Sequence, residues 1–185
     1  MFENIKFKSL CLSLCVFFHS HLLYAGSGSV SLKSEITLEP ACLINQKSTL
    51  NGANLNKLGD LDFGDLDASF SSVSATLSNE TNNAIHILCP VGSNVKVAFN
   101  AGRNANHVPS QFAANYQRAM SNGGGEYIAY QIYENNKSGK VLTPETSIDF
   151  LGGSEYVVRL YAEAVNAQSL SKGEYTDQIT VTVNF

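Results

Sequence analysis

Residues 175–185 read Tyr-Thr-Asp-Gln-Ile-Thr-Val-Thr-Val-Asn-Phe. From Ile179 onward, apolar and polar residues alternate without a fault. A period of two is typical of a β-strand that has one buried face and one solvated face. The pattern predicts that the buried face is formed by Ile179, Val181, Val183 and Phe185.

Shorter runs of the same kind recur along the chain, between turns rich in Gly, Pro, Asn and Ser. We expect strands over residues 41–44, 58–64, 73–77, 84–89, 95–99, 127–133, 141–142, 148–150 and 156–162. We expect a loop over residues 45–56, a hairpin turn over 90–93, and at most one or two helical turns over 111–119. Many short strands without a long helix predict an all-β sandwich.

The first 25 residues have the features of a secretory signal peptide. Lys6 and Lys8 precede an apolar run over residues 10–18, and Ala25 offers a small residue for cleavage. The apolar run is too short to span a membrane as a stable helix. We therefore expect an exported protein with no membrane insertion, although an uncleaved anchor is the alternative.

Residues 26–38 follow as a separate arm. A Gly-Ser-Gly-Ser lead-in at 26–29 is typical of a flexible linker. Four apolar residues then share one parity, broken only by Ser34: Val30, Leu32, Ile36 and Leu38. This pattern predicts a strand, which joins either the sheet of its own domain, residues 39–185, or that of a neighbour.

The two ends of the sequence permit the neighbour but do not require it. The best strand of the chain has nothing after Phe185 to cover its edge, and an exposed apolar edge is an aggregation hazard. Such an edge can be closed by a strand from another chain. From periodicity alone, the simpler interpretation is that residues 30–38 form the first strand of their own domain.

Composition excludes several classes of partner. The chain carries 12 Lys and Arg against 16 Asp and Glu, a net charge of −4. A mildly acidic chain without a basic patch argues against nucleic acid and against anionic membranes. Without the leader, roughly 160 residues remain, enough for one domain with a sizeable core.

Two of the four cysteines, Cys42 and Cys89, lie beyond the leader. An exported domain with two cysteines most simply forms one disulfide. The bridge would close a loop of about 47 residues and stabilise the fold by roughly 4 kcal/mol. Two free thiols, or a metal site with further ligands, are the alternatives.

Signals for catalysis are weak. His86 lies in an apolar strand, His107 lies in a polar loop, and no nucleophile, zinc or phosphate-loop motif is present. Four aspartates crowd around Gly64, but no Glu follows at the position that a calcium loop requires. We expect no enzyme, no cofactor and no metal site.

Several motifs resemble the spore coat protein U domain family. Gly173-Glu-Tyr-Thr-Asp177 with the strand after it resembles the closing motif of the family, and Leu61-Asp-Phe-Gly64 resembles its Leu-x-Phe-Gly. Arg118-Ala-Met120 and Tyr130-Gln-Ile-Tyr133 fall where the family has an Arg-containing segment and a Tyr-x-x-Tyr strand. Cys42 and Cys89 match its cysteine pair. Within the family, the chain is most similar to subunits of archaic chaperone–usher pili.

The resemblance implies an incomplete immunoglobulin-like β-sandwich that lacks its last strand. A periplasmic chaperone would lend a strand to the open groove. At the outer-membrane usher, the arm of the neighbouring pilus subunit would replace it by donor-strand exchange, and the pilus would reach the cell surface. In this scheme residues 26–38 are the donor, and Ile179, Val181, Val183 and Phe185 form the acceptor edge. A self-contained secreted sandwich, which binds a ligand or forms a coat layer, is the alternative. The sequence leaves open whether the subunit is the rod subunit or a minor adaptor.

Overall fold

The structure is a computed structural model that describes residues 33–37, 39–50 and 57–185. The chain divides into two units, Met1–Thr37 and Leu38–Phe185, which are described separately. In the first unit, residues 33–37 are all exposed and none lies in a strand. The predicted strand over residues 30–38 is therefore not formed in this part, and the rest of it lies outside the described residues.

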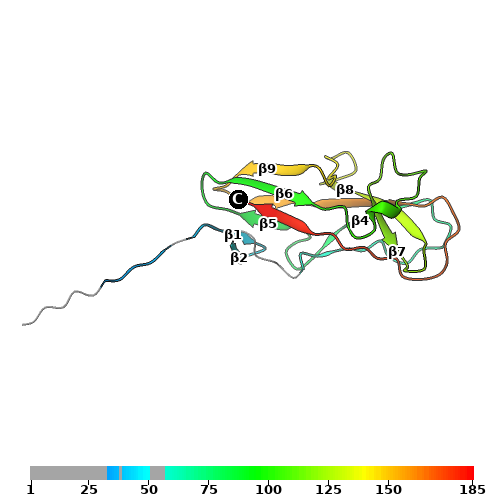
Figure 1. Ribbon diagram of the computed structural model, residues 1–185, viewed down its shortest axis with the longest axis horizontal. Helices are drawn as coiled ribbons and strands as arrows, with labels where there is room; N and C mark the ends of the chain where they lie inside the picture. Colours follow the sequence, from blue (N-terminus) through cyan, green and yellow to red (C-terminus); the bar gives the residue numbers. More distant parts are fainter. Residues whose placement is uncertain (1–32, 38, 51–56) are drawn as a thin grey trace, which may run out of the picture. The chain divides into compact units, whose positions relative to one another are not determined.

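In its described residues, the unit Leu38–Phe185 forms three antiparallel sheets (Figure 1). The first has the order β10-β5-β1-β2, formed by Tyr156–Val158, Ile85–Leu88, Ala41–Ile44 and Lys47–Leu50. The second has the order β3-β4-β11-β8-β7, formed by Asp60–Leu61, Ser72–Ser78, Leu160–Val165, Tyr127–Glu134 and Arg118–Ser121. The third has the order β12-β6-β9, formed by Val181–Asn184, Asn94–Phe99 and Ser147–Leu151.

One hydrophobic core joins the sheets into a sandwich-like fold. Ile87 of β5, Ile132 of β8 and Val97 of β6 are fully buried and belong to the same cluster of apolar side chains. The prediction of an all-β sandwich is confirmed. The described residues contain no α-helix, and a single turn of 3₁₀-helix, η1, covers Ala105–His107. Residues 111–115 form turns instead of the expected helical turns, and β7 follows.

The predicted hairpin over residues 90–93 is wrong. Pro90–Ser93 does form a turn, in which the Ser93 amide donates to the Pro90 carbonyl at 3.2 Å. However, β5 pairs with β1 and β10, whereas β6 pairs with β9 and β12. The turn carries the chain from one sheet to another, because both strands are strongly apolar and both bury side chains in the shared core.

The strand predicted over residues 156–162 is two strands in different sheets. β10 pairs with β5 in the first sheet, and β11 pairs with β4 and β8 in the second. Arg159 lies at the switch, and its carbonyl accepts a hydrogen bond from the Asn135 amide at 2.8 Å. Val158 and Leu160 on either side are both buried, so the alternation continues through a corner that periodicity alone does not reveal.

The predicted loop over residues 45–56 contains a strand in its described part. Asn45 and Gln46 have positive φ values of 47° and 65°, the conformation that a two-residue hairpin turn requires. They join β1 to β2 with Ile44 paired to Lys47. β2 is an edge strand in which only Thr49 is buried, and its sequence therefore lacks the apolar alternation that signals a strand. The strand expected at 58–64 is shorter and forms only β3. The strand expected at 141–142 is reduced to a bridge between Val141 and Tyr133.

Candidate functional site: an apolar groove

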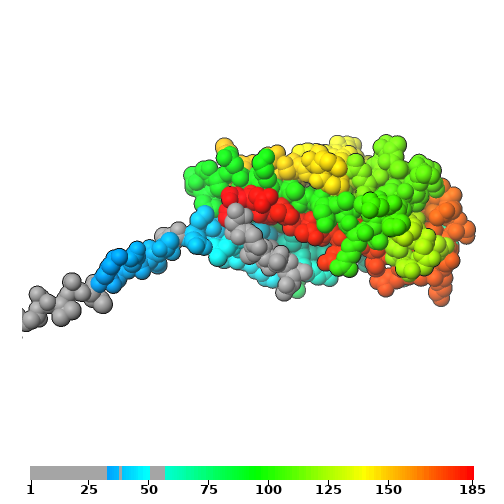
Figure 2. Space-filling view, in the orientation of Figure 1, coloured from blue at the N-terminus to red at the C-terminus, as the bar shows by residue number. Residues whose placement is uncertain are grey.

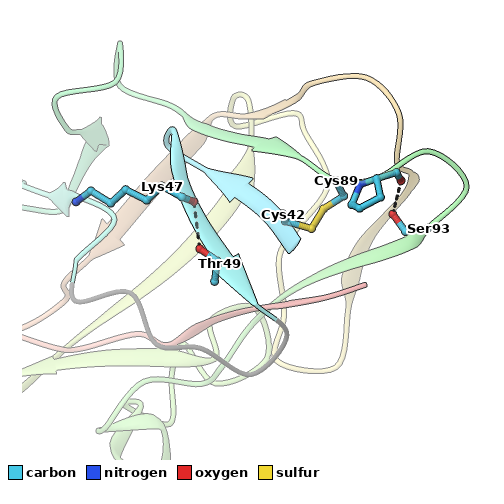
Figure 3. Close-up of a disulfide and its surroundings, with 6 residues drawn as sticks. Cys42, Lys47, Thr49, Cys89 and Ser93 are labelled. Carbon is cyan, nitrogen blue, oxygen red and sulfur yellow. Dashed lines mark hydrogen bonds between the residues drawn. A yellow bond between two sulfur atoms is a disulfide. The ribbon is translucent and has the colours of Figure 1, made fainter. Parts of the chain in front are cut away.

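The disulfide predicted between Cys42 and Cys89 is present (Figure 3). Cys42 lies in β1, Cys89 follows β5, and both are buried in the core. The two strands are paired, with Leu43 opposite Leu88, so the bridge reinforces an existing contact. It fixes the first strand of the unit, just beyond the arm, to the centre of the first sheet.

β12 is paired on one side only among the described residues. Val181 pairs with Phe99 and Val183 pairs with Val97, both in β6, and no described strand pairs with the other edge. The predicted alternation is present in the exposure of the side chains. The odd-numbered residues from 175 to 185 are half-buried, and the residues between them are exposed. However, the strand itself is shorter than the predicted 175–185, because residues 175–180 leave β6 and cross toward β7.

A groove of about 780 Å³ lies along the open edge of β12. One wall is formed by residues 175–181 and Val183, and the other by the end of β2 and by residues 57–61 and Phe63. Its lining also includes side chains that the rest of the structure buries almost completely: Leu77, Ile85, Phe99, Ile132 and Leu160. The groove thus reaches the edge of the core, although these five side chains are themselves buried. Figure 2 shows β12 and the residues before it at the surface on this side of the unit.

The structure brings most of the predicted acceptor edge into the groove. Ile179, Val181 and Val183 line it, and Phe185 packs against the core without lining the groove. Of the predicted donor residues, Ile36 is 82% exposed. Val30, Leu32 and Leu38 lie outside the described residues.

Sequence reasoning missed the opposite wall. Leu50 of β2 lines the groove and is 49% exposed, and Leu58, Leu61 and Phe63 line it from the segment around β3. The Leu61-Asp-Phe-Gly64 motif was a usable signal, because its two apolar residues share one parity. Nothing in the sequence near Leu50 indicated that it would face residues 175–183, over 120 positions away.

A polar network lies at the β7 end of the groove. The Asp177 carboxylate accepts hydrogen bonds from the Tyr130 hydroxyl at 2.6 Å and from the Arg103 amide at 2.7 Å. Burial, and then the bond to Asp177, raise the pKa of Tyr130. The phenol is thus kept protonated as a donor to the carboxylate.

Arg118 of β7 is fully buried beside this network. Its guanidinium donates to four acceptors: the carbonyls of Asn100 at 2.9 Å, Leu142 at 2.7 Å and Phe99 at 3.1 Å, and Oε1 of Gln131 at 3.0 Å. Burial lowers the pKa of Arg118 from its usual value, and the nearby Tyr130 and Asp177 oppose this effect. Because two of its acceptors are the carbonyls of Phe99, the last residue of β6, and of Asn100 after it, Arg118 holds the end of β6 in place.

Glu126 forms hydrogen bonds with the segment that leads into the groove, at Ser171 and Tyr175. Its carboxylate accepts from the Tyr175 hydroxyl at 2.8 Å, from Nδ2 of Asn122 at 2.6 Å and from the Ser171 amide at 3.1 Å. These hydrogen bonds, that of Tyr175 first, lower the pKa of Glu126. The ionised carboxylate therefore links the loop after β7 to the start of the C-terminal segment.

The residues considered for catalysis have local partners. His86 Nδ1 lies 3.3 Å from Glu155, and the His107 ring stacks on Tyr127 with centroids 4.6 Å apart. In the aspartate cluster, Asp62 accepts from the Gly64 amide and Asp67 from Ser69. No group of three or more metal-ligating side chains occurs in the part of the chain that the structure describes. That part also contains no helix long and apolar enough to cross a membrane.

The groove is suited to binding an extended apolar strand. Among the described residues, no strand pairs with the open edge of β12, and the lining of the groove offers apolar surface to alternate side chains. These are the two elements of β-strand addition: ladder hydrogen bonds set the register, and buried side chains add affinity.

Comparison with known proteins gives one family match. The model of the Spore Coat Protein U domain matches residues 29–182. None of the curated proteins matches the chain.

Several solved structures are similar to it, among them two chaperone complexes. The first is the CsuC-CsuE chaperone–tip adhesion subunit pre-assembly complex from archaic chaperone-usher Csu pili of Acinetobacter baumannii. It has 21% identity and a TM-score of 0.49, over 80% of this chain and 40% of that chain. The second is a chaperone–tip adhesin complex of CFA/I fimbriae biogenesis, with 11% identity and a TM-score of 0.41, over 79% of this chain and 42% of that chain. The chain thus spans about two-fifths of the length of the solved chains that it matches.

Proposed function

This chain belongs to the Spore Coat Protein U domain family, and we propose that it is a structural subunit of a surface pilus assembled by the chaperone–usher route. In this proposal residues 1–25 are a cleaved signal peptide, 26–38 are a donor arm and 39–185 are the pilin domain. The domain is an immunoglobulin-like sandwich without its last strand. Its role is mechanical rather than enzymatic, and the assembled pilus serves adhesion and biofilm formation.

The groove along β12 is the observation that carries the proposal. A sandwich that is complete in itself covers its apolar side chains, whereas here Leu58, Ile179 and Val181 are only half-buried and line a groove beside a strand edge without a described partner. Exposed apolar surface next to unpaired backbone is unfavourable in water. A strand from another chain would cover the apolar surface and pair with the open backbone edge at the same time.

The arm has the pattern that such a strand needs. Its four apolar residues share one parity, and Ile36 is exposed in the single chain. Burying four apolar side chains is worth about 6–12 kcal/mol before the costs of ordering. Because each subunit would give its arm to one neighbour and accept the arm of another, the contacts are head to tail and lead to an open fibre.

The partners follow from the same logic. Before assembly the groove must be covered, which is the task of a periplasmic chaperone. The outer-membrane usher then exchanges the chaperone strand for the arm of the neighbouring subunit, and the product reaches the cell surface.

Deletion of residues 26–38 tests the proposal. The truncated domain is expected to form a complex with the chaperone but to add no further subunit, which native gels of the purified complex can measure. Two point variants separate the faces of the arm: Ile36→Asp is expected to stop elongation, whereas Thr37→Asp, on the opposite face, is expected to permit it.

Two results would overturn the proposal. If the truncated protein loses its fold and never binds the chaperone, residues 26–38 are an intrinsic first strand. If the full chain stays monomeric with both arm variants indistinguishable from it, the protein is a self-contained sandwich that binds a ligand or forms a coat layer.

A further inference from the structure

Residues 176–180 form a span between two sheets. At one end, Thr176 and Ser121 of β7 exchange backbone hydrogen bonds of 2.9 and 3.0 Å. At the other end, the Asn100 amide donates to the Thr180 carbonyl at 3.0 Å, and Oδ1 of Asn100 accepts from the Thr180 amide at 2.9 Å. Beyond Thr180, β12 pairs with β6.

This span borders a cavity on each side. Residues 176–178 line the apolar groove, and they also line a polar cleft of about 570 Å³ together with Arg103, Asn104 and Asn122. A wall with space on either side has little packing to hold it. The apolar lining of the groove favours inward collapse, because collapse would remove that lining from water.

Asp177 follows Thr176 in the span, and its side chain adds a second attachment at this end. Its carboxylate accepts from the Tyr130 hydroxyl, from the Arg103 amide and from Nδ2 of Asn104, the last at 3.3 Å. Hydrogen bonds to a charged acceptor are stronger than neutral ones. They tie the span to β8 on one side and to the loop after β6 on the other.

Gly102 makes room for this carboxylate. It has a φ of +78°, and a Cβ placed there would lie only 1.9 Å from Oδ2 of Asp177. Gly92 has a similar φ of +83° with nothing within 4 Å of the corresponding Cβ position. Both glycines serve a left-handed backbone, but only Gly102 is also needed by a partner side chain.

We propose that Asp177 is a positioning residue that keeps the acceptor groove open for an incoming strand. The Tyr130 hydroxyl holds its carboxylate, and the absence of a side chain at Gly102 leaves room for it. This inference rests on the proposed function. It gives the polar network a role in the rate of strand uptake that is separate from its contribution to folding.

Uptake of a donor peptide by the full chain tests this role. A labelled peptide of residues 26–40 is added in excess to purified, refolded full chain, and its incorporation is followed by fluorescence anisotropy. Two pairs of variants are compared: Gly102→Ala with Gly92→Ala, and Tyr130→Phe with Tyr156→Phe. Tyr156 also donates to a carboxylate, that of Glu134 at 3.0 Å, but it does not line the groove.

Gly102→Ala and Tyr130→Phe are expected to slow uptake about tenfold, the effect of losing one hydrogen bond to a charged group. Gly92→Ala and Tyr156→Phe are expected to leave the rate within about twofold. Thermal unfolding of all four variants separates positioning from stability. The positioning role is overturned if both members of either pair behave alike, or if the rates simply follow the unfolding midpoints. If the unmodified chain takes up no peptide, the proposed function itself fails, and this inference fails with it.

Discussion

Two segments of this chain, residues 30–38 and 179–185, have an alternating pattern, and their described parts differ in structure. Residues 33–37 are exposed and form no strand, whereas Val181–Asn184 pair with β6 and alternate between half-buried and exposed. Val181–Asn184 have a partner strand, β6, whereas residues 33–37 pair with none of the described strands. Alternation determines which side chains would share a face, but a strand forms only where a neighbour satisfies its backbone groups.

The two edges of β12 also differ from each other. One edge is satisfied within the domain by β6, and the other borders the groove. In the proposed assembly, the arm of one subunit would pair with this open edge in the neighbouring subunit. Changes that alter one without the other should have very different effects.

The largest effect is expected from placing charge on the inner face of β12. In the double variant Val181→Asp and Val183→Asp, two carboxylates would face the core and the groove. Each substitution would lose much of the 1.5–3 kcal/mol that burial of an apolar side chain provides, and would add a desolvation cost. We expect loss of the folded domain and degradation after export, measured by immunoblot of the exported fraction.

The outward face of the same strand provides the control. Thr182→Asp and Asn184→Asp add the same charge to exposed positions and are expected to leave the amount of exported protein unchanged. Equal loss in both double variants would mean that charge, not the face of the strand, decides the outcome.

A smaller effect is expected from removing the disulfide that fixes β1, just beyond the arm. Cys42→Ser with Cys89→Ser removes a crosslink with a sequence separation of 47. Loop entropy predicts a loss of about 4 kcal/mol in the free energy of unfolding. Denaturant unfolding of the exported domain, with and without reductant, measures it. Reductant should lower the stability of the unmodified domain to that of the variant and should leave the stability of the variant unchanged. The explanation is contradicted if reductant changes the stability of the variant more than that of the unmodified domain.

The smallest effect is expected from the pH dependence that Glu126 provides. Its pKa is lowered in the folded state, so its contribution is fully present above the unfolded value of about 4.3 and is lost as the pH falls through the folded pKa. The melting temperature should therefore fall as the pH is lowered from about 5 to about 3, and Glu126→Gln should make that fall shallower. Glu80→Gln, at an exposed position, is a control with the same change in charge. Parallel profiles for all three proteins would show that the link from Glu126 to Tyr175 does not contribute.

The sequence predicted much of the architecture because burial imposes periodicity. Strands expected at 73–77 and 95–99 are present as β4 and β6, since the buried residues of each lie on one face. The strand expected at 127–133 is present as β8, which is buried on both faces. The predictions failed where a strand has little or no alternation, as in β2, or where alternation continues through a change of sheet, as at Arg159. A side chain can face the same core from either of two sheets, and periodicity does not distinguish them.

By itself, the sequence determined the all-β class, the cysteine pair and the buried face of residues 179–185, because these depend on residue type and local spacing. Only the tertiary structure decided that Leu50 and Phe63 lie across a groove from Ile179, and that Tyr130 and Gly102 hold Asp177. These contacts join residues from about 45 to about 130 positions apart. They depend on how the sheets pack, which no local pattern encodes.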